Sequence, residues 1–295
     1  MPPADDSPLP LWATRLPGTA TAVVRGNRIR YRVTGSGDPV LLLHGVGRSL
    51  EDWNEQHDLL SDRYRVVSLD LPGFAFSELD DRPATLHALA AFLPGVLDAL
   101  GIPGRVHLIG NSIGGAVAMT FAVECPERAA TLVLASSVGF GSEVTLALRL
   151  LAIAPNGLRL LRGTRVGSRR VTRSLFYDDR FVTRDRVDRA LWLSKRPGHS
   201  DTLLEAIREL GTFRGVNQGW RMQLLGRLRP LSIPTMVVWG EHDRVLPASQ
   251  LENAAALLPG AETHLFPATG HLPMIERSGE FASLVRQFFV GHPCG

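Results

Sequence analysis

A serine that could act as a nucleophile stands at the centre of Gly110-Asn111-Ser112-Ile113-Gly114, a G-x-S-x-G pentapeptide. An apolar, β-branched run precedes it and a helical pattern begins at Ala116, so the sequence predicts a strand, a sharp turn and a helix. Such a turn strains its central residue, and the glycines are needed because the chain passes too close to itself for a Cβ. Ser112 would stand at a helix N-terminus, where amides and the helix dipole favour developing negative charge. A serine that only caps the helix is the alternative.

A serine hydroxyl needs a neighbouring base, and the base needs a carboxylate to orient it. Of the nine histidines, His271 follows Gly270 in a loop after the last predicted strand, where it is free to reach Ser112. The other histidines fall in predicted helices, strands and tight turns, or in the tail. The loop after the predicted strand 234–240 offers Glu241 and Asp243. We predict that Asp243, short and rigid, orients His271, and that Glu241 is solvated or caps a backbone group.

Strands and helices alternate along most of the chain, which predicts a parallel sheet covered on both faces. We expect a β-hairpin over 21–33 with its turn at Gly26-Asn27 and a helix over 84–101. Buried strands are expected at 39–43, 64–70, 106–110, 130–135, 234–240 and 262–266. Ligands of such sheets bind at the carboxyl ends of the strands. The polar loops 44–47, 70–77, 110–115, 240–247 and 267–271 all follow strands, which is a second argument for a site there.

Residues 140–230 interrupt this alternation with helical patterns and hold 18 basic against 8 acidic side chains. The arginines are interleaved with acidic residues and lack clustered aromatic residues, so we predict a solvated helical face rather than a surface for nucleic acid or membrane. The expected organisation is a flexible N-terminal arm over 1–18, a core over 19–139 and 231–295, and a helical cap over 140–230.

The composition limits the class of protein. A hydrophobic content of 44% with 21% charged residues supports a large buried core. Two cysteines, Cys125 and Cys294, make no disulfide framework and have no metal-ligand spacing. The acidic, proline-rich start is unlike a signal peptide, and no apolar run is long enough to span a membrane. We therefore expect a cytoplasmic protein with a small-molecule substrate, no cofactor, no metal, no nucleic-acid partner and possibly a homodimeric state.

The chain resembles the α/β-hydrolase superfamily, in its cap-bearing branch, over about residues 20–290. The resemblance rests on L-L-L-H-G-V-G, D-L-P-G-F-x-F-S, G-N-S-I-G-G, W-G-E-H-D-R-V and A-T-G-H-L-P-M-I-E, in this order. It implies a mostly parallel, eight-stranded sheet with helices on both faces and an inserted helical cap. Ser112, Asp243 and His271 follow the chain order of the nucleophile-elbow enzymes. By the same resemblance the backbone N–H groups of Val46 and Ile113 form the oxyanion hole.

The sequence favours a serine hydrolase that cleaves a small hydrophobic carboxylic ester through an acyl-enzyme. Ser112 excludes branches with an aspartate nucleophile. G-N-S-I-G-G and the stretch 175–183 are similar to carbon–carbon bond hydrolases of aromatic-ring breakdown, which makes hydrolysis of a ring-cleavage dienoate the alternative. Leu272, where that group has tryptophan, and Arg189, one position from its lid arginine, place esters first. A non-catalytic ligand-binding protein is an alternative of another class. Candidate substrate contacts are Gly45, Asn111, Phe176, Trp192, Phe213 and Leu272.

Overall fold

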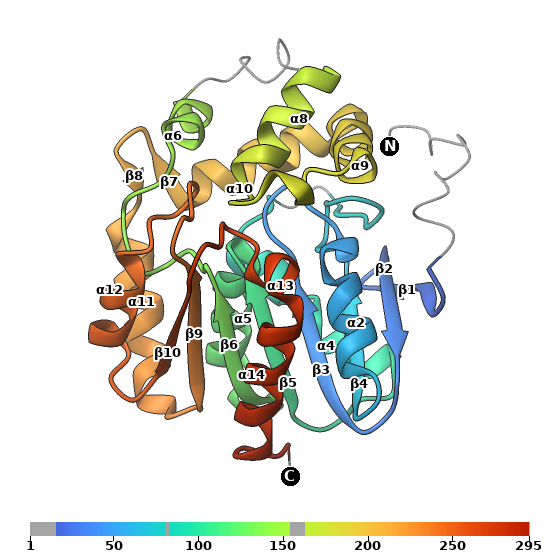
Figure 1. Ribbon diagram of the computed structural model, residues 1–295. Coiled ribbons are helices and arrows are strands. Elements are labelled where there is room, and N and C mark those ends of the chain that lie inside the picture. Colours follow the sequence, from blue (N-terminus) through green and yellow to red (C-terminus); the bar gives the residue numbers. More distant parts are fainter. Residues whose placement is uncertain (1–15, 81–82, 154–162, 295) are drawn as a thin grey trace.

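The computed structural model describes residues 16–80, 83–153 and 163–294 (Figure 1). Most of the arm predicted over 1–18 lies outside the described residues. Among them, no helix is both long and apolar enough to cross a membrane.

One sheet of eight strands forms the centre of the molecule, in the order β1-β2-β4-β3-β5-β6-β9-β10. Its strands are β1 (Thr19–Val24), β2 (Asn27–Thr34), β3 (Asp38–Leu43), β4 (Tyr64–Leu69), β5 (Val106–Asn111), β6 (Ala129–Ala135), β9 (Thr235–Gly240) and β10 (Glu262–Phe266). From β4 to β10 every neighbouring pair is parallel, and only β1, β2 and β4 pair antiparallel. The predicted fold class is confirmed.

The predicted hairpin is confirmed, but its turn lies one residue earlier than expected. Arg25 and Gly26 have φ of 51° and 81°, which is the pair of positive angles that a two-residue turn between twisted strands requires. Asn27 instead begins β2.

Helices cover both faces of this sheet (Figure 1). In the core they are η1 (Leu50–Trp53), α2 (Asn54–Leu60), α3 (Leu86–Ala90), α4 (Leu93–Ala99), α5 (Ile113–Glu124), η2 (Pro126–Arg128), α12 (Gln250–Leu257), α13 (Pro273–Glu276) and α14 (Ser278–Val290). The single helix predicted over 84–101 is two helices, and Pro94 lies in the first turn of the second, where its missing N–H costs nothing. The short helix α13 was not predicted.

Alternate residues of the central strands pack into different cores. In β3, Leu41 and Leu43 belong to the cluster beneath α4 and α5, whereas Val40 and Leu42 belong to the cluster beneath α2 and α14. Successive side chains of a strand point to opposite faces, and here both faces are covered. This explains why residues 39–43, which follow Asp38 in β3, are apolar without interruption.

The inserted segment contains α6 (Leu146–Ile153), α8 (Arg165–Ser174), η3 (Asp179–Phe181), α9 (Arg184–Lys195), α10 (His199–Leu210), β7 (Gly211–Thr212), β8 (Gly215–Val216), α11 (Gln218–Leu228) and η4 (Arg229–Leu231). The elements α6 to β8 lie over the carboxyl ends of the strands (Figure 1). Two features differ from the predicted all-helical cap. It includes the β7–β8 hairpin, and α11 packs on α5, with Leu224, Leu225 and Leu228 in the core cluster.

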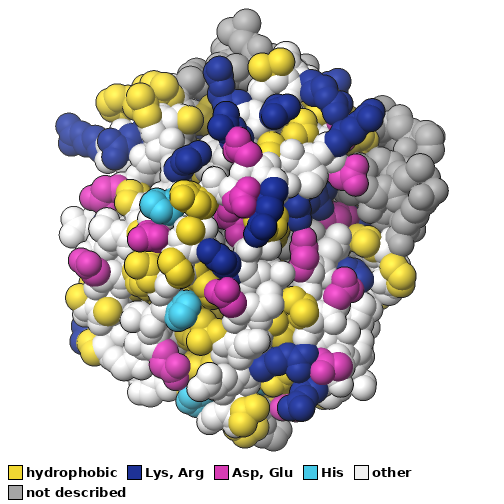
Figure 2. Space-filling view, in the orientation of Figure 1, with side chains coloured by type: hydrophobic (Ala, Val, Ile, Leu, Met, Phe, Trp, Pro, Cys, Tyr) yellow, Lys and Arg dark blue, Asp and Glu magenta, His cyan; other side chains and the backbone are white. Residues whose placement is uncertain are grey.

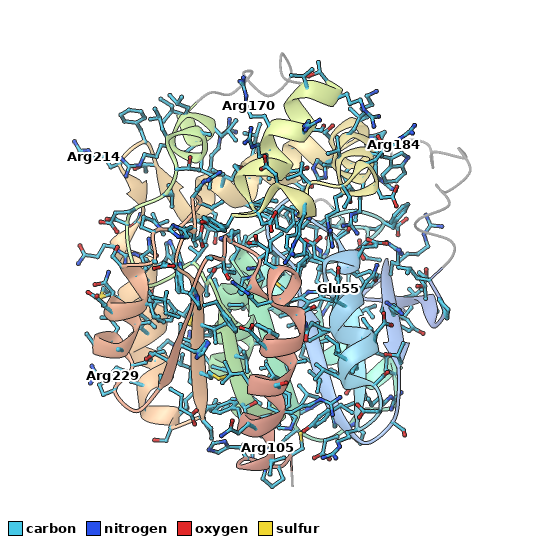
Figure 3. All side chains as sticks on the ribbon, viewed as in Figure 1. Glu55, Arg105, Arg170, Arg184, Arg214 and Arg229 are labelled. Atoms are coloured by element: carbon cyan, nitrogen blue, oxygen red, sulfur yellow. The ribbon has the colours of Figure 1, made fainter. Side chains whose placement is uncertain are left out.

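The arginines of this segment are mostly solvated, as predicted. Arg170, Arg184 and Arg214 are exposed and lie at the outside of the molecule (Figure 3). Figure 2 shows basic and acidic side chains mixed over this part of the surface. Arg189 and Arg221 are buried exceptions.

Candidate active site

Ser112 occupies a strained turn between β5 and α5. Its φ of 56° and ψ of −119° are unfavourable for a residue with a side chain. A Cβ on Gly110 would lie 2.3 Å from the carbonyl oxygen of Gly114, and one on Gly114 would lie 2.2 Å from that of Leu43. The predicted strand, turn and helix are therefore confirmed, with the glycines where close approach requires them. The Ser112 side chain makes no capping hydrogen bond to α5, which contradicts the capping alternative.

His271 and Asp243 form a buried hydrogen-bonded pair. Nδ1 of His271 lies 2.7 Å from Oδ2 of Asp243. The other oxygen, Oδ1, accepts hydrogen bonds from the backbone N–H groups of Val245 (2.8 Å) and Leu246 (3.0 Å). With Nδ1 carrying the proton, as this partner requires, Nε2 is left as the basic nitrogen. The exposed Glu241 accepts from Ala268 N–H, so it caps a backbone group as predicted.

His271 and Ser112 belong to one local network. Nδ2 of Asn111, the residue before Ser112, donates to the His271 carbonyl (3.1 Å) and to the Ala135 carbonyl (3.0 Å). Among the described residues no hydrogen bond joins the Ser112 hydroxyl to His271. Such catalytic hydrogen bonds commonly tighten only once substrate is bound.

The loop after β3 presents Val46 beside Ser112, and His44 fixes that loop. Nδ1 of His44 donates to the Gly45 carbonyl (2.7 Å), and its Nε2 accepts from Leu71 N–H (2.9 Å). Burial lowers the pKa of His44, which keeps the imidazole neutral and able to accept. Ile113 is the first residue of α5, where a backbone N–H has no partner within the helix. Ile113 thus offers one donor that an oxyanion would need. The same role for Val46, which lines the pocket with Ser112, stays a prediction.

An apolar pocket with a volume of about 60 Å³ opens at Ser112. Its walls are Val46, Ile113, Val138, Val144, Leu148, Ala152, Ile207, Leu210, Gly211, Thr212, Gly215, Val216, Val245 and Leu246. The cap contributes α6, the end of α10 and the β7–β8 hairpin. Aliphatic side chains dominate this lining, and none of the described residues that form it is charged.

None of the six substrate contacts predicted from the sequence lines this pocket. Phe176 and Leu272 are buried in the core cluster beneath α14. Trp192 stacks on Phe76 at 4.8 Å, and Phe213 is 47% exposed. Of these aromatic residues, Trp192 lies in α9, Phe176 in the loop after α8 and Phe213 in the turn between β7 and β8.

Gly45 and Asn111, the other two, lie against Ser112 without lining the pocket. A Cβ on Gly45 would lie 3.4 Å from the Ser112 Cβ and 3.2 Å from Oδ1 of Asn111. Both residues therefore shape the turn around the serine.

A buried charge cluster lies behind the oxyanion loop. Arg48 holds Asp52 through two hydrogen bonds of 2.6 Å, and Nη2 of Arg189 on α9 lies 3.4 Å from the same carboxylate. Burial opposes ionisation of Asp52, but Arg48 and Arg189 outweigh it and hold its pKa below the usual value. Burial lowers the pKa of Arg189. The Arg48 stem lies beside Gly45 and hence near Ser112.

Glu276 joins the His271 loop to the cap, a role that was not predicted. Its carboxylate accepts hydrogen bonds from the N–H groups of Tyr177 (2.9 Å), Asp178 (3.0 Å) and Gly270 (2.5 Å). Burial raises the pKa of Glu276, while these hydrogen bonds act in the opposite direction. The final glutamate of A-T-G-H-L-P-M-I-E could have drawn attention as an acid in an apolar run.

Relatives and solved structures resemble the chain over most of its length. The chain is 34% identical over 273 residues to the dihydrolipoyllysine-residue acetyltransferase component of the acetoin cleaving system of Cupriavidus necator, covering 92% of this chain and 68% of that one. It is 31% identical to a 2-hydroxy-6-oxononadienedioate/2-hydroxy-6-oxononatrienedioate hydrolase of a Pseudomonas species, with coverages of 89% and 92%. The structure matches a meta-cleavage product hydrolase from Pseudomonas fluorescens with a TM-score of 0.79 and 26% identity, with coverages of 92% and 97%.

The model of the alpha/beta hydrolase fold family matches residues 38–278, which include the Ser112 turn, the Asp243 loop and His271. The strand order and the strained serine agree with this match. The chain belongs to the alpha/beta hydrolase fold family.

Proposed function

We propose that this hydrolase cleaves a carbon–carbon bond next to a ketone in a small oxo-dienoate, with Ser112 as nucleophile, His271 as base and Asp243 as its orienting carboxylate. The observation that carries the proposal is the buried guanidinium of Arg189. Among the described residues, its one hydrogen bond is the 3.4 Å contact with Asp52, whose two oxygens Arg48 already holds at 2.6 Å. Two buried guanidinium groups therefore hydrogen-bond to one carboxylate, and the remaining N–H donors of Arg189 could bind a carboxylate of the substrate.

The relatives support this choice of bond and substrate. Two of them act, by their names, on 2-hydroxy-6-oxo-dienoates with one carboxylate, separated from the ketone by four carbons. Two others act, by their names, on dioates, which carry a second carboxylate beyond the ketone. In this chain the apolar pocket at Ser112 suits the group beyond the ketone. The Arg48–Asp52–Arg189 cluster suits the carboxylate end. We therefore rank carbon–carbon cleavage above ester cleavage, whereas the sequence alone favoured esters.

The reaction would proceed through an acyl-enzyme. His271 takes the proton of Ser112 as its oxygen adds to the ketone carbon, and the N–H groups of Val46 and Ile113 bind the oxyanion. The carbon–carbon bond then breaks, its electron pair enters the dienoate, and His271 gives the proton that it took from Ser112 to the departing carbon. His271 next activates water, which releases the acyl group as an acid. Losing one oxyanion donor typically costs ~3 kcal/mol of transition-state stabilisation.

Substrate and variant together test the proposal. A 2-hydroxy-6-oxo-dienoate and a neutral p-nitrophenyl butyrate are assayed with wild type, Arg189→Met and Arg184→Met. Arg184 is an exposed arginine of the same helix and serves as the matched control. Since a hydrogen bond to a charged group contributes about 1.5–3 kcal/mol, Arg189→Met should raise KM for the dienoate at least ~10-fold. The ester KM should change little, and Arg184→Met should match wild type. Equal losses on both substrates would contradict the carboxylate role.

Hydrolysis of a neutral hydrophobic ester is the second candidate. Two observations favour it. The described residues that line the pocket at Ser112 are all uncharged, and Leu272, the residue after His271, is buried. Rapid turnover of the butyrate with none of the dienoate would establish this candidate instead. A labelled fluorophosphonate addresses the binding-protein alternative, because a protein that only binds ligands should leave Ser112 unmodified.

A further inference from the structure

We propose that Asp38, His107 and Cys294 bind one divalent transition-metal ion, with Zn²⁺ the best match, at the amino end of the sheet. One ligand atom of each residue lies within 4.8 Å of the other two. Asp38 begins β3 and His107 is the second residue of β5, whereas Ser112 follows the carboxyl end of β5. The cluster is therefore at the opposite end of the sheet from Ser112. Figure 1 marks the C-terminus at this end, and Figure 3 labels Arg105 there.

The imidazole of His107 is buried and has one nitrogen available. Nδ1 lies 3.0 Å from Oγ1 of Thr131 on β6, whereas Nε2 is buried with no hydrogen-bond partner among the described residues. Because Nδ1 already has Thr131 as its partner, Nε2 is the ring nitrogen left to bind an ion. A buried nitrogen left without a partner costs free energy, and a metal ion would remove that cost.

Aromatic residues hold this ring in place. His107 stacks on Phe289 of α14 at 3.8 Å with an interplanar angle of 11°, and it meets Tyr64 edge-on at 6.3 Å. A ligand whose orientation is fixed by packing loses little freedom when it binds an ion.

The three donors form a set typical of zinc sites. Thiolate sulfur, imidazole nitrogen and carboxylate oxygen are all ligands of Zn²⁺, and a soft thiolate disfavours Mg²⁺ and Ca²⁺. A thiolate and a carboxylate also balance the double charge of the ion. No sequence motif reveals the set, because positions 38, 107 and 294 come together only when β3, β5 and the segment after α14 assemble. The bound ion would tie this last segment to the sheet.

Cobalt gives a direct readout, because Co²⁺ bound by a thiolate acquires a charge-transfer absorption. The full chain, stripped of metal with a chelator, is titrated with Co²⁺ alone. We expect one Co²⁺ per chain with this absorption, and its loss when Zn²⁺ is added. Cys294→Ala should abolish the band. Cys125→Ala is the matched control, since Cys125 is the other cysteine and lies outside the cluster, and it should retain the band.

Two further measurements complete the test. Asp38→Asn changes an exposed side chain and should weaken Co²⁺ affinity at least ~10-fold with the same fold by circular dichroism. Zn²⁺ should raise the Tm of wild type but not of Cys294→Ala, and it should leave the rate of Ser112 labelling unchanged. Absence of the band in wild type, its persistence in Cys294→Ala, or unchanged affinity in Asp38→Asn would overturn the proposal.

Discussion

Replacing Glu276 by alanine tests whether His271, the proposed catalytic base, depends on its attachment to the cap. Glu276 is buried, and its two oxygens together accept from three backbone N–H groups. One donor, Gly270, precedes His271. The other two, Tyr177 and Asp178, follow the segment whose Leu175 carbonyl accepts from His271 N–H at 2.8 Å. Truncation therefore releases the base loop on one side and the cap segment on the other.

The free-energy cost follows from these contacts. A hydrogen bond to a charged group contributes about 1.5–3 kcal/mol. The bond from Gly270 is buried and should be lost at full cost, whereas Tyr177 and Asp178 are partly buried and can be rehydrated. We therefore expect a loss of ~2–4 kcal/mol, which a domain with ~5–15 kcal/mol of stability survives. Since misplacing a catalytic group by an ångström can cost 100-fold in rate, kcat/KM should fall by about that factor.

The assay separates positioning from stability. Thermal unfolding gives the Tm, and the rate of Ser112 labelling by a small fluorophosphonate reports the base without needing a filled cap pocket. Glu280→Ala is the control, because Glu280 is an exposed acid nearby in α14 with a single 3.8 Å ion pair to Arg277. Glu276→Gln keeps one acceptor oxygen and should fall between wild type and alanine in both readouts. If Glu276→Ala lowers the Tm but labels and turns over substrate within ~3-fold of wild type, Glu276 only stabilises the fold and our reasoning is refuted.

Four other outcomes are expected. Ser112→Ala should lose at least ~1000-fold in kcat with an unchanged circular dichroism spectrum, and Asp243→Asn should lose a comparable factor because the imidazole is held in the wrong tautomer; steady-state kinetics measures both. Leu148→Trp should fill the pocket and lower kcat/KM at least ~10-fold for butyrate while sparing acetate esters, in an acyl-chain series. Burial lowers the pKa of His57 to about 3, from about 6.5 when unfolded, so the unfolded state binds an extra proton between these values. Stability should therefore fall as the pH drops below about 6.5, by ~1.4 kcal/mol per pH unit for this proton, and urea unfolding at several pH values should show that slope reduced in His57→Gln.

The sequence predicted the parts of the site that depend on local geometry. A strained serine between a strand and a helix requires glycines at fixed positions, so Ser112 could be recognised from five residues. His271 and Asp243 follow strands, and parallel strands bring their carboxyl ends to one edge. The same reasoning found the sheet, because an apolar run such as 39–43 is buried on both faces. Each of these inferences needs only the order and period of the residues.

The pocket could not be predicted in this way. Trp192 and Phe213 were chosen for their aromatic rings, yet Trp192 packs on Phe76 and Phe213 is exposed. The lining comes instead from α6, α10 and the β7–β8 hairpin, whose strands of two residues each are too short to show a periodic pattern. The helices α6 to α10 lie over the carboxyl ends of the strands, so their rotation depends on tertiary contacts that a single sequence does not encode locally.

The burial of individual charged residues could not be predicted from the sequence either, and the proposed substrate depends on these residues. From the sequence, Arg189 was one of 18 basic residues in a segment whose arginines were expected to be solvated. The structure separates it from exposed neighbours such as Arg184, because a buried guanidinium that shares Asp52 with Arg48 has donors to spare while solvated arginines bind water. A carboxylate substrate would gain from that arrangement, and a neutral ester would not. In our proposal the choice between carbon–carbon and ester cleavage thus depends on whether Arg189 binds an anionic group of the substrate, more than on the proposed triad, which both reactions would share.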